Sequence, residues 1–260
     1  FKVAPSIFSE SPIETVSDKY AFVPTFKLLD TFRDAGYYPI MASESKVRDE
    51  ENQGYQKHII QFRSLENLLR PNAKDEYEDI VLTNSHNRTS SFIVDLAIFR
   101  IVCSNMLVVP SKSFVHASIV HVGFTQDKVK NAIAEVTSYM PKIKELVATF
   151  KSIHLSKAEE QMLANAAIDI RFDTNTHYIK ADELLKVNYE EDYVPTLWSA
   201  YNRIQEAMIR GGVKMKNLIT NKTFTSKAIN GIDATIKFNK ELFEAVEQVA
   251  LLKSNHNLAA

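Results

Sequence analysis

The sequence predicts an α+β fold, with a mainly antiparallel sheet in the first half, then a long helix and a mostly helical second half with a basic hairpin. In the first half, runs of strand-forming residues alternate with turn signals. From Val129 to Phe150, apolar residues recur at alternating steps of four and three, the spacing of one helical stripe. We expect a single domain over 1–260. The alternative is a subdivision into a sheet-rich part, 1–125, and a helix-rich part, 126–260.

The first half is predicted to begin with a helix that starts at Pro24 and is capped by Gly36. The Asp49–Gly54 segment is polar and ends in glycine, which favours a turn between two strands. The further elements expected here are a hairpin with strands at 37–48 and 58–62, a short helix at 65–70, and strands at 79–83, 92–107 and 114–124.

Pro141 interrupts the apolar stripe of the second half, which predicts a kink or two separate helices. Ser156 and Glu159 have the spacing of a capping box and open the next helix. Gly211 and Gly212 are expected to end a later one. The remaining predicted elements are helices at 181–187 and 196–210, a hairpin at 213–236 around Asn221, and a terminal helix from Phe238. The stripe is expected to pack against the chain's own sheet, with a partner subunit as the alternative.

Composition limits the classes of function. The formal net charge is −1, which excludes a protein that binds nucleic acid by being basic everywhere, so any such binding must be local. The single cysteine, Cys103, cannot form an internal disulfide and favours a reducing compartment, with the cytoplasm as the expectation. No apolar run approaches the roughly 20 residues of a membrane helix.

The strongest local charge lies in the segment from Tyr201 to Asn230. It sets six cations against the single acid Glu206, a net charge of +5, and Phe224 in the same segment offers a ring for stacking on a base. Clustered cations beside glycines and hydroxyl groups are typical of phosphate binding. The alternative is a solvated hairpin whose lysines prevent edge-to-edge aggregation. The cations are Arg203, Arg210, Lys214, Lys216, Lys222 and Lys227.

A second polar region runs from Asn84 to Ser91, and the apolar run that follows, to Val109, is interrupted by polar groups at Arg100 and again at a Cys-Ser-Asn triplet. The first stretch favours a hydrogen-bonded turn over a ligand site. Arg100 must find an anion or carbonyl groups, and Asp95 is a candidate partner. The arginines that would extend a phosphate-binding track are Arg48, Arg63, Arg88 and Arg100, and with His86 and Asn105 they make up a candidate additional polar site.

The sequence predicts no catalytic residues, no metal and no cofactor. His116 and His121 are five residues apart, which places them on opposite faces of a strand. Cys103 lacks the flanking signature of a nucleophile paired with His86 or His116. The chain has only six glycines, and none form a nucleotide-binding loop. A non-enzymatic protein is therefore expected.

Many ordered blocks along the chain resemble the phage/plasmid-like protein family, a domain of unknown function from prophages, phages and conjugative plasmids typified by YafZ and YubP. The resemblance implies a mobile-element protein of α+β fold in the host cytoplasm, with no known reaction. The blocks include 3–8, 36–39, 45–48, 84–86, 99–105, 202–206, 209–212, 226–232 and 239–243; the stretch 171–195 matches less well.

Three functions are in competition. The first is single-strand DNA binding, annealing or protection through the basic segment, with a homo-oligomer repeating the patch along the strand. The second is an interaction protein that modulates a host factor in an anti-defence or regulatory role. The third is a metal-dependent nuclease whose carboxylates, for example Asp79, Asp95 and Glu206, meet only in three dimensions.

Overall fold

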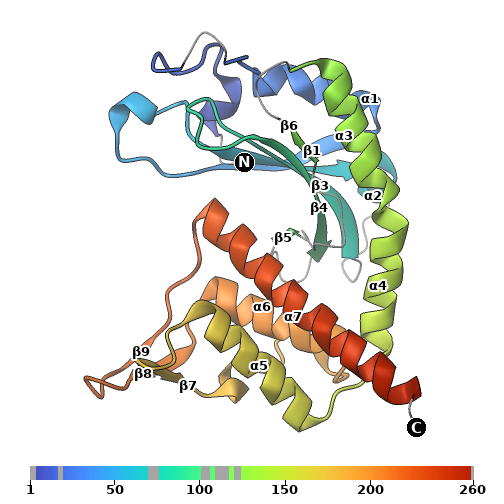
Figure 1. The fold of residues 1–260 in the computed structure, drawn as a ribbon, viewed down its shortest axis with the longest axis vertical. Helices are drawn as coiled ribbons and strands as arrows, with labels where there is room; N and C mark the ends of the chain where they lie inside the picture. The colour runs from blue at the N-terminus through green and yellow to red at the C-terminus, as the bar shows by residue number, and fades with distance from the viewer. Residues whose placement is uncertain are drawn as a thin grey trace. The chain divides into compact units, whose positions relative to one another are not determined.

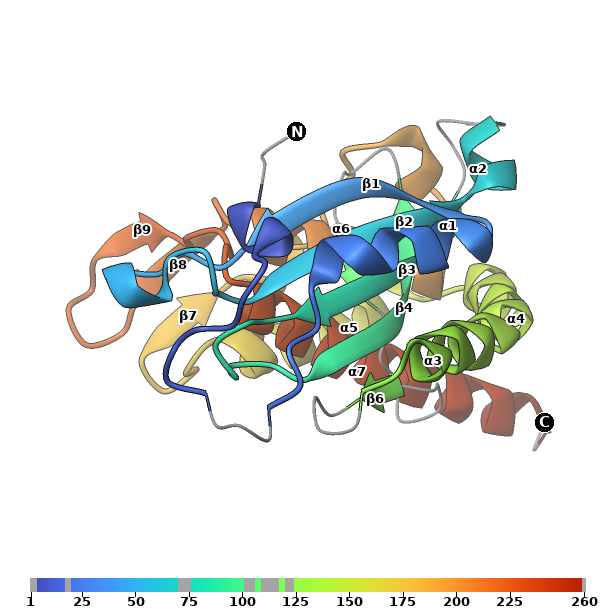
Figure 2. The same ribbon diagram turned by 90° about the horizontal axis from the view of Figure 1, so that it is seen from above.

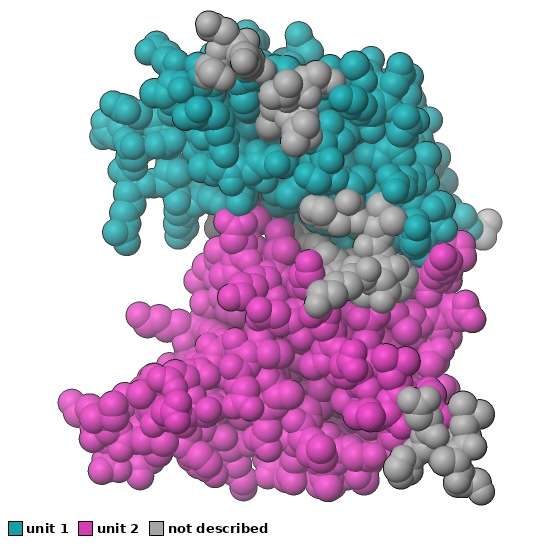
Figure 3. Space-filling view, in the orientation of Figure 1, with its two compact units in different colours: residues 1–140 teal, residues 141–260 magenta. Residues whose placement is uncertain are grey.

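The computed structural model describes residues 4–16, 20–69, 76–100, 106–108, 117–119 and 124–258. The chain divides into two units, unit 1 at 1–140 and unit 2 at 141–260 (Figure 3). Unit 1 holds the large sheet, and unit 2 holds long helices and a small second sheet (Figure 1). The predicted α+β class is confirmed.

Unit 1 is built on an antiparallel sheet in which five strands follow the order β1-β2-β3-β4-β5, while β6 also pairs with β4. In the predicted hairpin, Tyr38 pairs with Arg63 and Glu44 pairs with His58. The central strands run side by side in Figure 2. The strands are β1 (Tyr37–Glu44), β2 (His58–Ser64), β3 (Glu76–Asn84), β4 (Phe92–Arg100), β5 (Met106–Val108) and β6 (Ala117–Ile119).

Alternate residues of a strand point to the same side of a sheet, and directly paired residues share a face. By this rule, one face of the sheet in unit 1 is apolar. The helix α1 (Leu29–Asp34) packs against β1 and stacks Phe32 on Phe62, with ring centroids 4.1 Å apart. The helix α3 (Gln126–Ser138) contacts β4, β6 and α1 and buries Val129 and Ile133. Further side chains on this face are Ile60, Ile80, Leu82, Val94 and Leu96, all buried.

The short elements around the sheet follow local signals. The predicted helix at 24–36 begins as a 3-10 turn, η2 (Thr25–Leu28), and continues as α1. Gly36 follows its last residues with a φ of +85°, where an L side chain would be strained. The 3-10 helix η1 (Pro5–Phe8) precedes it, η3 (Glu50–Asn52) lies in the β1–β2 turn, and α2 (Leu65–Leu69) confirms the predicted short helix.

The prediction of one continuous strand over 92–107 is wrong. β4 ends at Arg100, and β5 pairs back against it with Phe99 opposite Met106. A run of strand-forming residues gives no sign of this reversal because each part, taken alone, favours extended backbone. Residues 101–105 lie outside the described residues. Of the strand expected at 114–124, the structure describes 117–119, as β6, and 124.

The apolar stripe is divided at Pro141, as predicted. α3 ends at Ser138 and α4 (Met140–Ser152) begins two residues later, with the proline in its first turn, where its missing N–H costs nothing. In unit 2, α4 buries Ile143, Val147 and Phe150, and Phe150 lies 5.7 Å from Phe243, measured between ring centroids. The stripe therefore contributes to the chain's own core.

Unit 2 packs three further helices against one another: α5 (Lys157–Arg171), α6 (Leu197–Arg210) and α7 (Ile232–Leu258). The predicted capping box at Ser156 and Glu159 is present, and a second one joins Thr196 and Ser199. Tyr201, which is fully buried, contacts the rings of Trp198 and Phe243 at the centre of this helical core.

Two predictions in unit 2 need correction. The helix expected at 181–187 is only a 3-10 turn, η4 (Ala181–Glu183), and the carbonyl of Leu185 accepts a hydrogen bond from Arg203 instead of from its own segment. The hairpin expected at 213–236 is shorter, because α7 begins at Ile232. Another 3-10 turn, η5 (Glu190–Asp192), precedes α6. Among the described residues, no helix combines the length and apolar character needed to cross a membrane.

Candidate nucleic-acid interface

The basic segment forms part of a small antiparallel sheet in unit 2, with the order β7-β8-β9. In β8 (Lys214–Asn217), Lys214 and Lys216 are exposed, and Met215 between them is buried. Lys214 pairs with Thr225 and Lys216 with Thr223, both on β9 (Thr223–Thr225). Because directly paired residues share a face, the two lysines and two threonines form one outward surface, here called the lysine face.

Four lysines of the segment are exposed and lie beyond 4 Å, the ion-pair distance, from every carboxylate oxygen in the part of the chain that the structure describes. They are Lys214, Lys216, Lys222 and Lys227. Nearby cations are neutralised, since Lys186 contacts Glu183 at 2.6 Å and Lys180 lies 3.6 Å from Asp182. A hydrogen bond from Lys186 lowers the pKa of Glu183, and the positive charges of Lys186, Lys214 and Lys180 lower it further.

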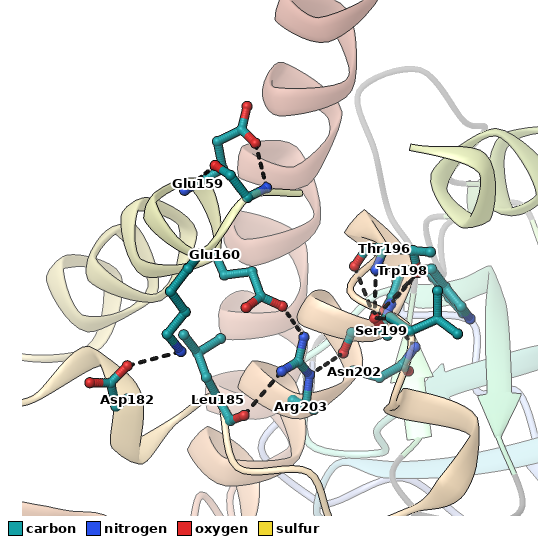
Figure 4. A network of polar contacts seen from close by, with 12 residues as sticks. Glu159, Glu160, Asp182, Leu185, Thr196, Trp198, Ser199, Asn202 and Arg203 are labelled. Atoms are coloured by element: carbon teal, nitrogen blue, oxygen red, sulfur yellow. Dashed lines mark hydrogen bonds and ion pairs between the residues drawn. The ribbon is translucent and has the colours of Figure 1, made fainter. Parts of the chain in front are cut away.

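Arg203 does not belong to this surface. Its side chain is 6 % exposed and forms an ion pair with buried Glu160 (Figure 4). Its Nη1 donates to the Leu185 carbonyl at 3.0 Å, and its Nε donates to the Ser199 carbonyl at 3.2 Å. A guanidinium held in this way joins α5, α6 and the segment after η4, and it cannot reach a phosphate in solvent.

Arg210 occupies an intermediate position at the end of α6. Its Nη1 lies 2.6 Å from Oε1 of Glu206, and its side chain is 49 % exposed. The buried carboxylate of Glu206 also accepts from the Tyr189 hydroxyl at 3.0 Å and from Asn188 Nδ2 at 3.2 Å. Loss of hydration and the hydrogen bond to Glu206 raise the pKa of Tyr189.

These groups border a cavity of about 180 Å³ between α6 and the root of β8. Lys186 and Arg210 bring positive charge to its lining, while Glu183 and Glu206 bring equal negative charge. Each cation contacts one of the carboxylates, so the cavity is polar but electrically balanced. The lysines that form no ion pair within the described ranges lie beyond it, although the charge of Lys214 also acts on Glu183.

Gly211 and Gly212 attach the hairpin to α6. At Gly211, with φ of +73°, an added Cβ would lie 2.6 Å from the backbone N of Ala228, so only glycine permits this approach. Gly212 N donates to the Ser226 carbonyl at 2.8 Å, and Ser226 N donates to the Val213 carbonyl at 2.9 Å. Arg171 also donates to the Lys227 carbonyl. Lys214 and Lys216 therefore project from a strand pair that is anchored at its root.

Phe224, predicted to stack on a base, lies on the face opposite the lysines. It pairs with Met215, and its ring centroid is 5.9 Å from that of His177, although the residue remains 42 % exposed. The aromatic residue that shares the lysine face is Tyr178 of β7 (His177–Ile179), which pairs with Lys216 and is 57 % exposed. Sequence reasoning missed Tyr178 because it lies outside the basic segment.

The additional polar residues of unit 1 do not form one exposed track. Arg63 is buried, and its guanidinium pairs with Asp79 at 2.9 Å and 2.7 Å while lying over the rings of Tyr77 and Phe99. Gln61 Nε2 donates to the same carboxylate at 2.5 Å. Burial raises the pKa of Asp79, and the Arg63 contacts act against that rise.

The other members of this set are divided. Arg48 and Arg88 are exposed, and Arg88 has a φ of +63°. Arg100 is buried, and the strand register places Glu76 opposite it, while Asp95, the expected partner, is on the other face of β4. Asn105 lies outside the described residues.

His86 is fully buried in a cluster with His58, Thr25 and Asn84. Thr25 Oγ1 lies 2.8 Å from His58 Nε2 and 3.5 Å from His86 Nε2, and Asn84 Nδ2 donates to it at 2.9 Å. Burial lowers the pKa of His58 to about 4. The cluster ties the segment before α1 to the ends of β2 and β3.

No group of three or more potential metal ligands occurs within the described ranges. Asp79 and Asp95 share a face of unit 1, but the Asp79 carboxylate is bound by Arg63 and Gln61. Glu206, the third carboxylate considered for a nuclease, belongs to α6 in unit 2. Cys103, His116 and His121 lie outside the described residues.

Comparison with known proteins identifies the family. The family described as "Domain of unknown function (DUF932)" matches residues 12–243. The chain belongs to this family. It is 32 % identical over 247 residues to the UPF0380 protein YfjQ of Escherichia coli strain K12, covering 95 % of this chain and 88 % of that protein. The UPF0380 protein YafZ of the same strain matches to the same extent. No solved structure matches the chain.

The YafZ-like resemblance predicted from the sequence blocks is thereby confirmed. In this DUF932 chain, two of those blocks meet in space, since Ile229 N donates to the Ile209 carbonyl at 2.9 Å beside the contact of Gly211 with Ala228. All four exposed lysines lie within the part of the chain that the DUF932 family matches.

Proposed function

We propose that this protein is a DNA-binding protein of a phage or plasmid that holds single-stranded DNA on the lysine face in the host cytoplasm. The observation that supports this proposal is a set of four exposed lysines without ion pairs in the part of the chain that the structure describes, two on β8 and one at each end of β9, in a hairpin anchored at Gly211. Of the six cations of the segment, Arg203 is neutralised by Glu160 and Arg210 by Glu206. The four lysines carry what remains.

The arrangement of the lysine face suits a phosphate backbone. Lys214 and Lys216 are separated by two residues of a strand, about 7 Å, so their ammonium groups can contact different phosphates. Thr223 and Thr225 beside them supply neutral donors of the kind that position nucleic acid.

Tyr178 supports a preference for single strands. An exposed aromatic ring beside cations is a stacking platform for an unpaired base, whereas the bases of a duplex already stack on one another. A homo-oligomer would repeat the patch along a strand, which suits a chain with a net charge of only −1.

The test is oligonucleotide binding by a variant in which Lys214, Lys216, Lys222 and Lys227 are all changed to glutamate. We expect binding to be abolished, because a phosphate-binding surface becomes acidic. For the unmodified protein, log K should fall with log salt concentration with a slope of about −3 if four phosphates are contacted.

The matched control changes four exposed lysines distributed elsewhere, Lys27, Lys46, Lys130 and Lys240, to glutamate. The net charge of this control changes by the same amount as that of the test variant. Comparing the two therefore shows whether lost binding is due to the local site or to the overall charge. The control should retain most of the affinity. Equal loss in both variants, or binding that does not respond to salt, would contradict the proposal.

A second candidate function is an interaction protein that modulates a host factor. It is favoured by large exposed apolar side chains on two packed helices, Met162 on α5 and Leu251 and Leu252 on α7. Pull-down from host lysate with the four-lysine variant separates the two candidates. A specific partner retained by that variant favours this second function.

A further inference from the structure

We propose that the tip of the β8–β9 hairpin, Leu218 and Ile219, is an apolar wedge that enters between adjacent bases of the bound nucleic acid. This inference rests on the proposed function and assigns a separate task to a different part of the same hairpin. Figures 1 and 2 both show this loop extending away from the helices of unit 2.

The first observation is the exposure of the tip. Leu218 is 46 % exposed and Ile219 is 75 % exposed. Turns are normally made of glycine, proline, asparagine, aspartate and serine, which adopt turn geometry or bond their own backbone. Two neighbouring branched apolar residues at the outermost point of a hairpin lose hydrophobic stabilisation unless something covers them.

The second observation is that the tip has a defined conformation. Asn217 Oδ1 accepts hydrogen bonds from Ile219 N at 3.0 Å and from Thr220 N at 2.7 Å. Asn217 N donates to the Lys222 carbonyl at 2.9 Å, and Leu218 N donates to the Thr176 carbonyl at 2.8 Å. Asn221 takes the left-handed conformation that closes the turn, with φ of +57°. The apolar side chains are therefore presented by a preformed turn.

The third observation identifies the occupant. Lys216 precedes the tip and Lys222 follows it, both exposed and without a carboxylate within 4 Å in the described part of the chain. A base step has two backbone phosphates beside an apolar stacked interior, and the tip offers cations on either side of apolar side chains. Leucine and isoleucine are among the residues that enter base steps in nucleic-acid-bending proteins.

Two parts of the hairpin therefore have different functions. The lysines supply affinity that depends on salt and is independent of sequence, whereas the tip unstacks one step and changes the shape of the strand. Separation of bases at the contact would expose them for stacking on Tyr178 or for pairing with a second strand.

The test uses oligonucleotides that carry 2-aminopurine, whose fluorescence rises when the base is unstacked. Titration of the full chain into a single strand and into a duplex should raise the fluorescence. A variant with Leu218→Ser and Ile219→Ser, compared at protein concentrations that give equal occupancy of the oligonucleotide, should lose the rise, while its binding should keep the salt dependence that phosphate contacts give. Ile219→Met, which keeps an apolar tip, should retain the rise.

The outcomes separate this inference from the proposed function. Salt-dependent binding by the unmodified chain without any fluorescence rise overturns the wedge and leaves the proposed function standing. The same is true if the serine variant gives an undiminished rise. Absence of binding by the unmodified chain overturns both. Binding to phosphatidylglycerol vesicles that the serine variant loses, with its 2-aminopurine signal intact, assigns the tip to a membrane surface and overturns the wedge.

Discussion

The buried imidazole of His58 makes a quantitative prediction about acid stability. Its Nδ1 lies 3.1 Å from the Gln56 carbonyl, which can only accept, so Nδ1 carries the proton and Nε2 accepts from the Thr25 hydroxyl. Burial holds the pKa at about 4, against 6.5 for an unperturbed histidine. Between pH 6.5 and about 4, His58 therefore stays neutral in the folded state, whereas it is protonated in the unfolded chain.

The sign follows from which state binds more protons. Between pH 6.5 and about 4 the unfolded chain binds the proton of His58 and the folded chain does not, so the free energy of unfolding falls as the pH falls. At about 1.4 kcal/mol per pKa unit, the full loss is about 3 kcal/mol below pH 4. At pH 5 the loss is already about 2 kcal/mol relative to pH 8.

The assay is urea unfolding followed by far-ultraviolet circular dichroism at a series of pH values from 4 to 8. The reference is His58→Asn, which removes the titrating ring and keeps an amide that can donate near the position of Nδ1. Carboxylates titrate in both proteins, so the difference between their pH profiles isolates His58. The variant should be less stable at pH 8 and should lose less stability on acidification.

Parallel pH profiles for the two proteins would refute this reasoning. They would mean that His58 accepts a proton in the folded state as easily as in the unfolded chain. Its ring would then be solvated, and the Thr25 cluster would not be buried as described above.

Two further predictions concern unit 2. Gly211→Ala should destabilise the protein by about 3 kcal/mol or more, because the new Cβ would lie 2.6 Å from backbone atoms. Gly212→Ala places its Cβ where no atom lies within 4 Å, so it should cost only about 1–2 kcal/mol, for the strain of a φ of +79°. Thermal unfolding of the two variants should rank them in that order, and equal melting temperatures would contradict the contact. Glu160→Met alone should cost roughly 3–5 kcal/mol by leaving Arg203 buried and unpaired, and adding Arg203→Met should recover part of that loss. A double variant less stable than Glu160→Met in urea unfolding would argue against this.

Local chemistry accounts for the features that the sequence predicted well. The capping box at Ser156 and Glu159 depends on residues three apart, and the division at Pro141 depends on one ring without an N–H. The pairing of Phe99 with Met106 is different, because strand propensity does not say where a chain reverses. Features that depend on neighbouring residues, such as helix caps and breaks at proline, were therefore predictable, and the pairing of strands was not.

The site shows the same limit. Arg203 looked like a member of a basic surface because charge was counted along the chain, and its partner Glu160 lies 43 residues away in sequence. Tyr178 was missed for the converse reason, since only the pairing of β7 with β8 brings it beside Lys216. The lysines at 214 and 216 were identifiable because a strand alternation exposes both together.

The contact at Gly211 has a consequence for how this region can vary in length. With the Lys227–Ala228 backbone lying where a side chain would otherwise be, one extra residue between the end of α6 and β8 would move that contact out of register and turn the lysines toward the opposite side of the sheet. The root of the hairpin therefore tolerates no insertion, whereas an insertion at Thr220 leaves the Gly211 contact in place and alters only the turn that Asn217 closes. In a loop-length scan, insertions before β8 should lower the stability of the protein, and insertions at Thr220 should change the tip without lowering it to the same extent.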